Sequence, residues 1–320
     1  MDRKPGRRYA ATLLGRAARR ALATPSGWDV VAVFRRSLYC GSPDGSLICL
    51  GPASIGAGPL NVICDLPKGA GWEADVLEPG AAAEWDGTTF RVDGCFAFEL
   101  AGAREWRPVP VPGDWAPDVV AASVRAVAAE TAACAPADGL ARVISTLAPA
   151  GAAPPDAARS PLDQLAGPAV TALAGWLRSV RDQAGPPTPG PPSELESLIG
   201  LGPGLTPSGD DLLGGAMIAL RAFGRPDAAE RLADRLLPRA RSRTHRISLA
   251  HLASAADGEG MAALHALLAA LCEPDLPQLH ACLDALAAVG HTSGWDALAG
   301  ASVVAAVMSS PRPGRESRWS

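Results

Sequence analysis

The residues with the clearest potential for chemistry gather in one glycine-spaced stretch of the chain. It combines glycines, two hydroxyls and two adjacent carboxylates, and it runs into an apolar segment: Ile199-Gly200-Leu201-Gly202-Pro203-Gly204-Leu205-Thr206-Pro207-Ser208-Gly209-Asp210-Asp211-Leu212-Leu213-Gly214-Gly215. Glycine tolerates positive φ angles and lets the backbone approach a ligand closely. The free N–H groups at a helix start favour an anion or a capping carboxylate. The stretch therefore predicts an anion site leading into a helix over 212–223.

A well-capped helix after a tight turn is the alternative. Thr206 followed by Pro207 is typical of an N-cap and a first helical residue. Ser208 with Asp211 three residues later gives a second register, close to a capping box. A cap needs only one of these groups, so we favour a ligand site. The stretch has neither the Gly-Lys-Ser/Thr ending of a P-loop nor the preceding β run of a dinucleotide fold.

A second loop shows the same pattern. In Gly290-His291-Thr292-Ser293-Gly294-Trp295-Asp296-Ala297-Leu298-Ala299-Gly300, five positions match the first loop at fixed offsets, from Ser208 aligned with Ser293 to Gly215 aligned with Gly300. Two independent caps are the alternative. We expect instead that the loops form two halves of one site. His291 lies inside the loop and is a candidate acid/base, with a plain loop residue as the alternative.

Between the loops, Thr244 and Ser248 lie one turn apart in a predicted helix over 227–256. They predict either a polar stripe lining the site or buried hydroxyls bonded to the preceding turn, and both readings stay open. The other four histidines show no metal-ligand spacing, so we predict no zinc site and assign no residue as a metal ligand.

Composition excludes several functional classes. The 320 residues carry a formal net charge of −4, which argues against a nucleic-acid partner. No apolar run is long enough to span a bilayer, so no membrane association is expected. The seven scattered cysteines lack Cys-x-x-Cys spacing and are typical of reduced packing residues in a cytoplasmic protein.

The order of patterns predicts an α+β protein with a small N-terminal antiparallel β domain and a larger, mostly α-helical domain. Short β-rich runs separated by turns occur at 30–34, 37–40, 47–50, 60–64 and 88–92. The predicted divisions are an N-terminal helix in 1–27 (helical over 6–23), a β-rich domain 28–115, a helical segment 116–185, a Pro-rich linker 186–192, a helical domain 193–308 and a disordered tail 309–320.

Helical periodicity predicts the elements of the second half. Besides 212–223 and 227–256, apolar spacing favours helices at 119–133, 140–147, 162–180, 260–271, 276–289 and 295–308. Pro238 is expected to kink or split the helix over 227–256.

The two loops, together with Thr244…Ile247-Ser248 between them, resemble the AllH-like family. The resemblance extends over most of the chain, is most specific in the first loop, and is weaker in Gly51-Pro52-Ala53-Ser54-Ile55 with Gly58-Pro59. It implies a subunit of oxamate carbamoyltransferase in allantoin and purine breakdown, with sister subunits and a small anionic substrate as partners. The implied reaction is phosphorolysis of oxalurate to oxamate and carbamoyl phosphate.

The resemblance and the loop chemistry together give a set of candidate residues. Asp210 or Asp211 would orient a donor group or bind a divalent ion, and no cofactor is identified. The catalytic candidates are His291, Asp210 and Asp211; the substrate-binding candidates are Gly202, Gly204, Thr206, Ser208, Gly209, Thr244, Ser248, Thr292, Ser293 and Asp296. The rival interpretation is a non-catalytic anion-binding or scaffold subunit of a metabolic complex.

Overall fold

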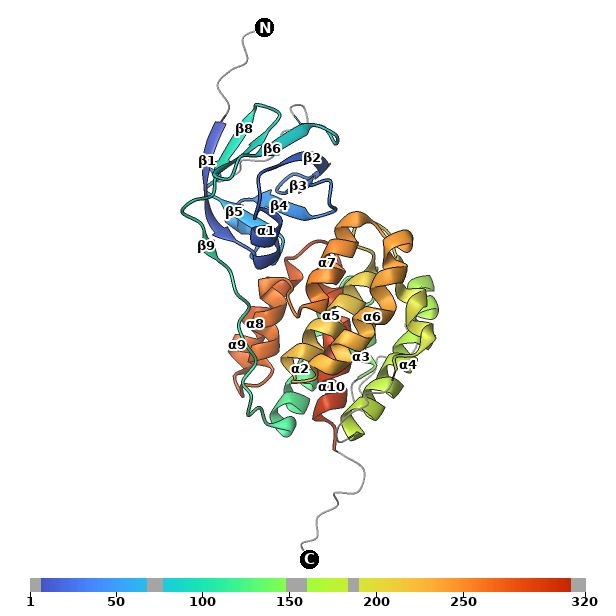
Figure 1. Ribbon diagram of the computed structural model, residues 1–320. Coiled ribbons are helices and arrows are strands. Elements are labelled where there is room, and N and C mark those ends of the chain that lie inside the picture. The colour runs from blue at the N-terminus through green and yellow to red at the C-terminus, as the bar shows by residue number, and fades with distance from the viewer. Residues whose placement is uncertain (1–6, 68–76, 148–159, 184–189, 312–320) are drawn as a thin grey trace, which may run out of the picture. The chain divides into compact units, whose positions relative to one another are not determined.

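The computed structural model describes residues 7–67, 77–147, 160–183 and 190–311 and divides into two compact units, Met1–Pro108 and Val109–Ser320 (Figure 1). The first unit is a β domain with one short helix, and the second is helical. The α+β class with a smaller N-terminal β domain is therefore confirmed. The boundary lies at 108/109, before the predicted 115/116.

The β unit is one mixed sheet that closes on itself. Its hydrogen-bonded order is β5-β4-β3-β2-β6-β7-β8-β1-β9, and a further pairing of β5 with β1 closes eight of the strands into a barrel. The strands are β1 (Arg7–Leu14), β2 (Ser26–Val33), β3 (Leu38–Gly41), β4 (Leu47–Gly51), β5 (Asn61–Cys64), β6 (Ala82–Trp85), β7 (Thr89–Val92), β8 (Phe96–Glu99) and β9 (Arg104–Glu105). The five predicted strands correspond to β2, β3, β4, β5 and β7.

The sheet predicted as antiparallel is mixed, with most of its strand pairs antiparallel and three parallel. The pairs β1–β8, β1–β9 and β4–β5 are parallel. The link from β4 to β5 passes through a 3₁₀ turn, η1 (Ala53–Ile55), instead of a hairpin turn, and so returns the chain in the same direction. Turn residues between two β runs therefore do not fix their relative direction.

The predicted N-terminal helix was also wrong over most of its length. Residues Arg7–Leu14 form β1, and only Arg16–Ala21 are helical, as α1. Ala11 pairs with Cys64, and a shift of register follows before Leu13. Such a bulge breaks the period of two in a strand. It explains why the apolar spacing in this segment resembles a helix.

Aromatic side chains fill the interior of the β unit. Phe90 and Phe98 are fully buried, and the ring of Trp28 meets Phe90 edge to face with centroids 5.5 Å apart. The seven cysteines of the chain are unpaired. Burial raises the pKa of the Cys49 and Cys64 thiols to about 12, which makes these two groups inert packing residues.

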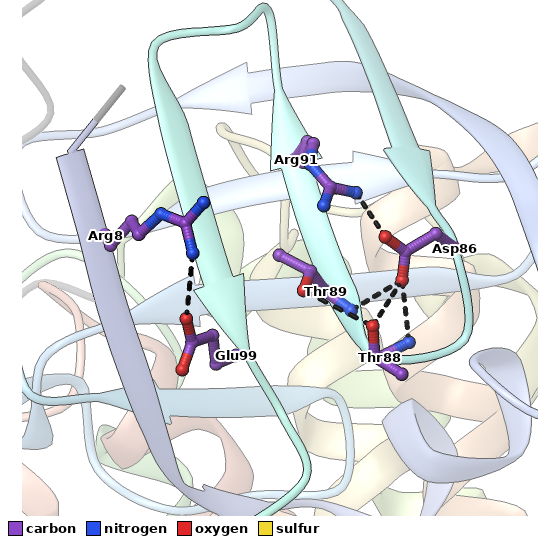
Figure 2. A network of polar contacts seen from close by, with 6 residues as sticks. All are labelled: Arg8, Asp86, Thr88, Thr89, Arg91 and Glu99. Atoms are coloured by element: carbon purple, nitrogen blue, oxygen red, sulfur yellow. Dashed lines mark hydrogen bonds and ion pairs between the residues drawn. The ribbon is translucent and has the colours of Figure 1, made fainter. Parts of the chain in front are cut away.

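Polar contacts cover an outer face of the barrel (Figure 2). Asp86 Oδ1 accepts hydrogen bonds from the backbone N–H groups of Thr88 and Thr89, both 2.8 Å, and so fixes the β6–β7 turn. Its other oxygen pairs with Arg91. These bonds hold the pKa of Asp86 well below its usual range. A surface hollow of about 900 Å³ adjoins this turn and contains both Asp86 and Arg91.

The second unit contains the remaining helices, and each predicted helical segment overlaps one or more of them. They are α2 (Pro117–Cys134), α3 (Arg142–Ser145), α4 (Pro161–Asp182), the 3₁₀ helix η2 (Ser193–Leu198), α5 (Ser208–Ala222), α6 (Pro226–Arg243), α7 (Arg246–Ala256), α8 (Ala262–Ala270), α9 (Leu276–Ala287) and α10 (Ser293–Ser309). Among the described residues, no helix combines the length and the apolar character needed to cross a membrane.

The predicted helix over 227–256 is two helices, but Pro238 does not divide them. Pro238 lies inside α6, and the break comes at Thr244 and His245. His245 caps α7, since its Nδ1 accepts the backbone N–H of Ile247 at 3.2 Å. The cap by His245 starts α7 directly after α6 ends. Apolar periodicity alone does not indicate this break.

One hydrophobic core joins the whole helical unit, from Val120 in α2 to Val307 in α10. The predicted segments 116–185 and 193–308 therefore share one hydrophobic core and do not form two separate ones. Most of the Pro-rich linker and of the tail lies outside the described residues, and α10 extends to Ser309. Helices α5 and α10, buried along most of their length, are the centre of this core.

Candidate functional site

Helices α5 and α10 approach each other so closely that only glycine fits at two contacts. A Cβ atom on Gly215 would lie 1.9 Å from the carbonyl oxygen of Ala297, and one on Gly300 would lie 1.8 Å from that of Leu212. Gly215 aligns with Gly300 and Leu212 with Ala297, so the two contacts are reciprocal. The helices therefore meet as two elements related by an approximate two-fold axis.

The loops before the two helices follow the same plan. Gly209 donates its N–H to Leu201 O at 2.9 Å, and Gly294 donates its N–H to Val289 O at 3.2 Å. A Cβ on either glycine would lie close to a carbonyl oxygen, 2.1 Å from Leu198 O or 2.2 Å from Leu286 O. The repeated backbone therefore begins about a helical turn before each loop, earlier than the matched sequence positions.

Neither predicted capping register exists. Helix α5 begins at Ser208 after Pro207, and α10 begins at Ser293 after Thr292, without a side-chain cap in either. Instead the hydroxyls reach across: Thr206 Oγ1 and Ser293 Oγ are 3.0 Å apart. The structure thus brings the two loops together, because each helix start supplies polar groups to the other.

The place where the starts of α5 and α10 meet is the junction of the two halves. Asp211 and Asp296 are the equivalent acidic residues at this junction. Burial raises the pKa of Asp211 well above its usual range, contacts with Ser293 and Thr206 oppose this, and the nearby Asp296 adds to it. Burial also raises the pKa of Asp296, against bonds from Leu140 and Ser208. Each aspartate therefore interacts with the serine of the opposite helix, which repeats the reciprocal plan.

The surroundings of the two aspartates differ. Asp296 is fully buried, and its Oδ1 accepts the backbone N–H of Leu140 at 2.6 Å. Gly139, at φ +105°, lies over it, and a Cβ there would be 2.8 Å from Asp296 Oδ1. Asp211 is partly exposed and has no counterpart of the Leu140 bond among the described contacts. The Oδ2 atoms of both aspartates are buried and accept no hydrogen bond from the described residues.

Asp210 holds the first loop in place. Its Oδ1 accepts the N–H of Gly200 at 3.0 Å, and its Oδ2 accepts the hydroxyls of Thr244 and of Ser248, the latter at 2.7 Å. The hydroxyls of Thr244 and Ser248 therefore bond Asp210 and not the preceding helical turn. The two residues also do not share one helix, because Thr244 follows α6 and Ser248 lies in α7. Since both oxygens of Asp210 are occupied, its geometry suits positioning the loop more than reacting with a substrate.

Three glycines give the first loop its course. Gly200, Gly202 and Gly204 have φ angles of +72°, +113° and +90°. A Cβ on Gly202 would lie 2.9 Å from the N–H nitrogen of Ser208, whereas one on Gly204 would meet nothing within 4 Å. Gly202 is therefore required for packing, and Gly204 only for its backbone conformation.

His291 forms a contact that the sequence did not predict. Its Nε2 lies 2.8 Å from Oδ2 of Asp138 in the loop after α2. The two side chains are 75% and 69% exposed, so the pair adds little to stability. The hydrogen bond from His291 lowers the pKa of Asp138. The segment Asp138-Gly139-Leu140 therefore contacts the second loop twice, and no local sequence signal announced it.

The described residues hold no group of three or more His, Cys, Asp or Glu side chains arranged for a metal ion. The groups with which the junction can bind a ligand are its two helix N-termini, the hydroxyls of Thr206 and Ser293, and the carboxyl group of Asp211.

Comparison with protein families gives a match within the second unit. Residues 198–305 match the family described as oxamate carbamoyltransferase subunit AllH. Both loops, Thr244 and Ser248 fall in the matched range, and the weaker resemblance around Gly51-Pro52 does not. Comparison with curated proteins and with solved structures gave no match. The segment that is similar to the AllH family therefore contains both halves of the junction.

Proposed function

We propose that this protein is a subunit of a carbamoyltransferase-type complex that acts on a small carboxylate, oxamate or oxalurate, with carbamoyl phosphate as the second partner. The family supplies the transferase class. The observation that carries the site assignment is the meeting of two helix starts at Thr206 and Ser293, 3.0 Å apart. Two positive helix ends at one point favour an anion more than one alone.

The proposed roles follow the geometry. The N–H groups around Gly202 and Gly204, with the hydroxyls of Thr206 and Ser208, bind the anion from the first half. Gly209 supports them by fixing the loop through its N–H on Leu201 O. Thr292, Ser293 and Asp296 support it from the second half. Asp210, through Thr244 and Ser248, keeps the first loop in its binding conformation.

The remaining catalytic candidates have different tasks. His291 is the proposed acid/base group, with Asp138 orienting its ring. Burial raises the pKa of Asp211 well above its usual range, which favours the neutral carboxyl group and limits negative charge at the anion site. A neutral carboxyl group there also offers one hydrogen-bond donor and one acceptor.

The anion site is tested by ligand-induced thermal stabilisation. Phosphate, carbamoyl phosphate or oxamate should raise the melting temperature of the wild-type chain more than that of Gly204→Val. Gly224→Val is the matched control, because Gly224 also has a positive φ (+75°) and open space, but at the far end of α5. Equal shifts in wild type and Gly204→Val would remove the loop from the binding site.

Turnover separates this function from a non-catalytic scaffold subunit. The chain together with its co-purifying subunits should convert oxalurate and phosphate to oxamate and carbamoyl phosphate. Substitutions in the loop pair should abolish this turnover while the complex still assembles. Normal turnover with a disrupted loop pair would favour the scaffold role.

A further inference from the structure

Helix α6 carries arginines at intervals of four residues, the spacing that places side chains on one face of a helix. They are Arg231, Arg235, Arg239 and Arg243. Glu196 in η2 pairs with the middle two: its Oε1 lies 3.1 Å from Arg235 Nη2, and its Oε2 lies 2.6 Å from Arg239 Nε. This row of arginines therefore faces η2, and its middle part has an acidic counterion.

The chain that continues from η2 passes the last arginine of the row. Gly200 lies against the backbone of Arg243, since a Cβ on Gly200 would be 2.3 Å from the carbonyl oxygen of Arg243. The following residue, Thr244, donates its hydroxyl to Asp210 in the first turn of α5. Arg243 is therefore fixed beside the first loop, through Gly200 where the loop begins and through Asp210 where the loop has entered α5.

The side chain of Arg243 has no counterion although it lies beside this loop. It is exposed, and it makes no ion pair or hydrogen bond with the described residues. Asp210 does not pair with it, because both oxygens of Asp210 accept hydrogen bonds from other groups of the chain. Pro203 and Gly204, at the tip of the loop, are exposed as well. A guanidinium group without an acidic partner thus adjoins an accessible glycine loop.

The charge of this guanidinium group favours one class of anion. Arginine presents a planar fork of N–H donors that matches two oxygens of a phosphate or a carboxylate. The Coulomb energy is proportional to the charge of the ligand, so a doubly charged phosphate gains about twice as much as a singly charged carboxylate.

We propose that Arg243 is a further substrate-binding residue, which pairs with the phosphate-bearing substrate at the first loop. This inference rests on the proposed function and deepens it, because it names the residue that distinguishes a phosphate or carbamoyl phosphate from a singly charged carboxylate. The loop supplies N–H groups and hydroxyls, and Arg243 supplies the positive charge.

Calorimetric titration of the full chain with inorganic phosphate, and separately with oxamate, tests this assignment. At pH 8 phosphate is mainly a dianion, whereas oxamate carries one charge. Arg243→Ala should weaken phosphate binding about fivefold, the factor that about 1 kcal/mol produces, because an exposed ion pair contributes up to about that amount. Oxamate binding should weaken only about twofold, since half the charge gives half the Coulomb energy.

Two further variants separate a binding role from a change in net charge. Arg231→Ala removes the same charge from the same row, and Arg231 is also exposed and without a partner among the described residues. It lies twelve positions earlier, about 18 Å along the helix, which exceeds the screening length of about 8 Å at 0.15 M salt. Arg231→Ala should therefore bind phosphate as wild type does. Arg243→Lys keeps the charge and should recover part of the lost affinity, and melting curves check that each variant is folded.

Four outcomes overturn the assignment: unchanged phosphate affinity in Arg243→Ala, equal losses in Arg243→Ala and Arg231→Ala, equal losses for phosphate and oxamate, or no phosphate binding by the full chain. Each is distinguishable from failure of the proposed function. In the first three cases Gly204→Val would still reduce ligand-induced stabilisation if the loop binds the anion. In the fourth, turnover by the complex would still report on the transferase function.

Discussion

The loop before α5 and the loop before α10 share one backbone plan but differ in what covers their aspartates. In the second half, the segment Gly139-Leu140 closes over Asp296. In the first half, Asp211 stays partly exposed, and Asp210 has been added to hold the longer loop through Thr244 and Ser248. The comparison shows that one backbone plan can be held by different contacts, from a distant segment in one half and from Asp210 in the other.

The largest expected effect concerns the reciprocal helix contact. Gly215→Ala and Gly300→Ala each force a Cβ against a backbone carbonyl oxygen, at 1.9 and 1.8 Å. Both should lower the free energy of unfolding by more than about 3 kcal/mol and by similar amounts. Denaturant unfolding measures this.

Gly214→Ala is the matched control for that pair. Its Cβ would lie 3.6 Å from Cβ of Ala255, an ordinary contact, so the helix should gain roughly 0.5–1 kcal/mol. A small change in the free energy of unfolding for either Gly215→Ala or Gly300→Ala would contradict the equivalence of the two helix contacts.

The next largest effect concerns turnover and the candidate acid/base group of the second loop, His291. If His291 is the acid/base group, His291→Gln should lower turnover of the complex by about 10²–10⁴-fold with no loss of stability, since the side chain is exposed. Asp138→Asn should weaken turnover less and alter its pH profile, because Asp138 acts only through the ring of His291. Normal activity of His291→Gln would reduce it to a loop residue.

A smaller effect distinguishes the two aspartates by pH. The folded protein holds the Asp211 proton more tightly than the unfolded chain does, so this group lowers stability as pH rises above its ordinary value of 3.8. Asp211→Asn should therefore raise the melting temperature at pH 7 and leave it unchanged near pH 4. A pKa difference of one unit corresponds to about 1.4 kcal/mol.

Asp296→Asn provides the comparison. The Leu140 N–H lowers the pKa of Asp296 and opposes its burial, so less stability is recovered on substitution. Thermal unfolding from pH 4 to pH 8 should show the larger gain for Asp211→Asn. Equal gains, or a gain for Asp211→Asn that persists at pH 4, would contradict the electrostatic difference between the halves.

Sequence alone predicted the elements whose signals are local. Apolar periodicity predicted the helices α2, α4, α5 and α10. The fixed offsets in the sequence predicted that Ser208 corresponds to Ser293 and Asp211 to Asp296. The meeting of Thr206 with Ser293 agrees with the expectation that the loops lie together. The binding roles of these residues stay predictions.

What the sequence did not predict depends on contacts between distant parts of the chain. Strand β1 pairs with β5, β8 and β9, and these pairings override a helical apolar spacing. Ser208 and Ser293, expected to cap their own helices, contact the aspartates of the opposite helices instead. The Leu140–Asp296 bond joins residues more than 150 positions apart, and nothing near either residue indicates the other.

The most direct test of the account is a double-mutant cycle on ligand affinity with Ser208→Ala and Ser293→Ala. If the two halves form one site, the effects on oxamate or phosphate binding should deviate from additivity by at least about 0.5 kcal/mol. Each single variant should also weaken binding by itself. Effects that add to within about 0.3 kcal/mol would show two independent helix starts and would contradict a shared site.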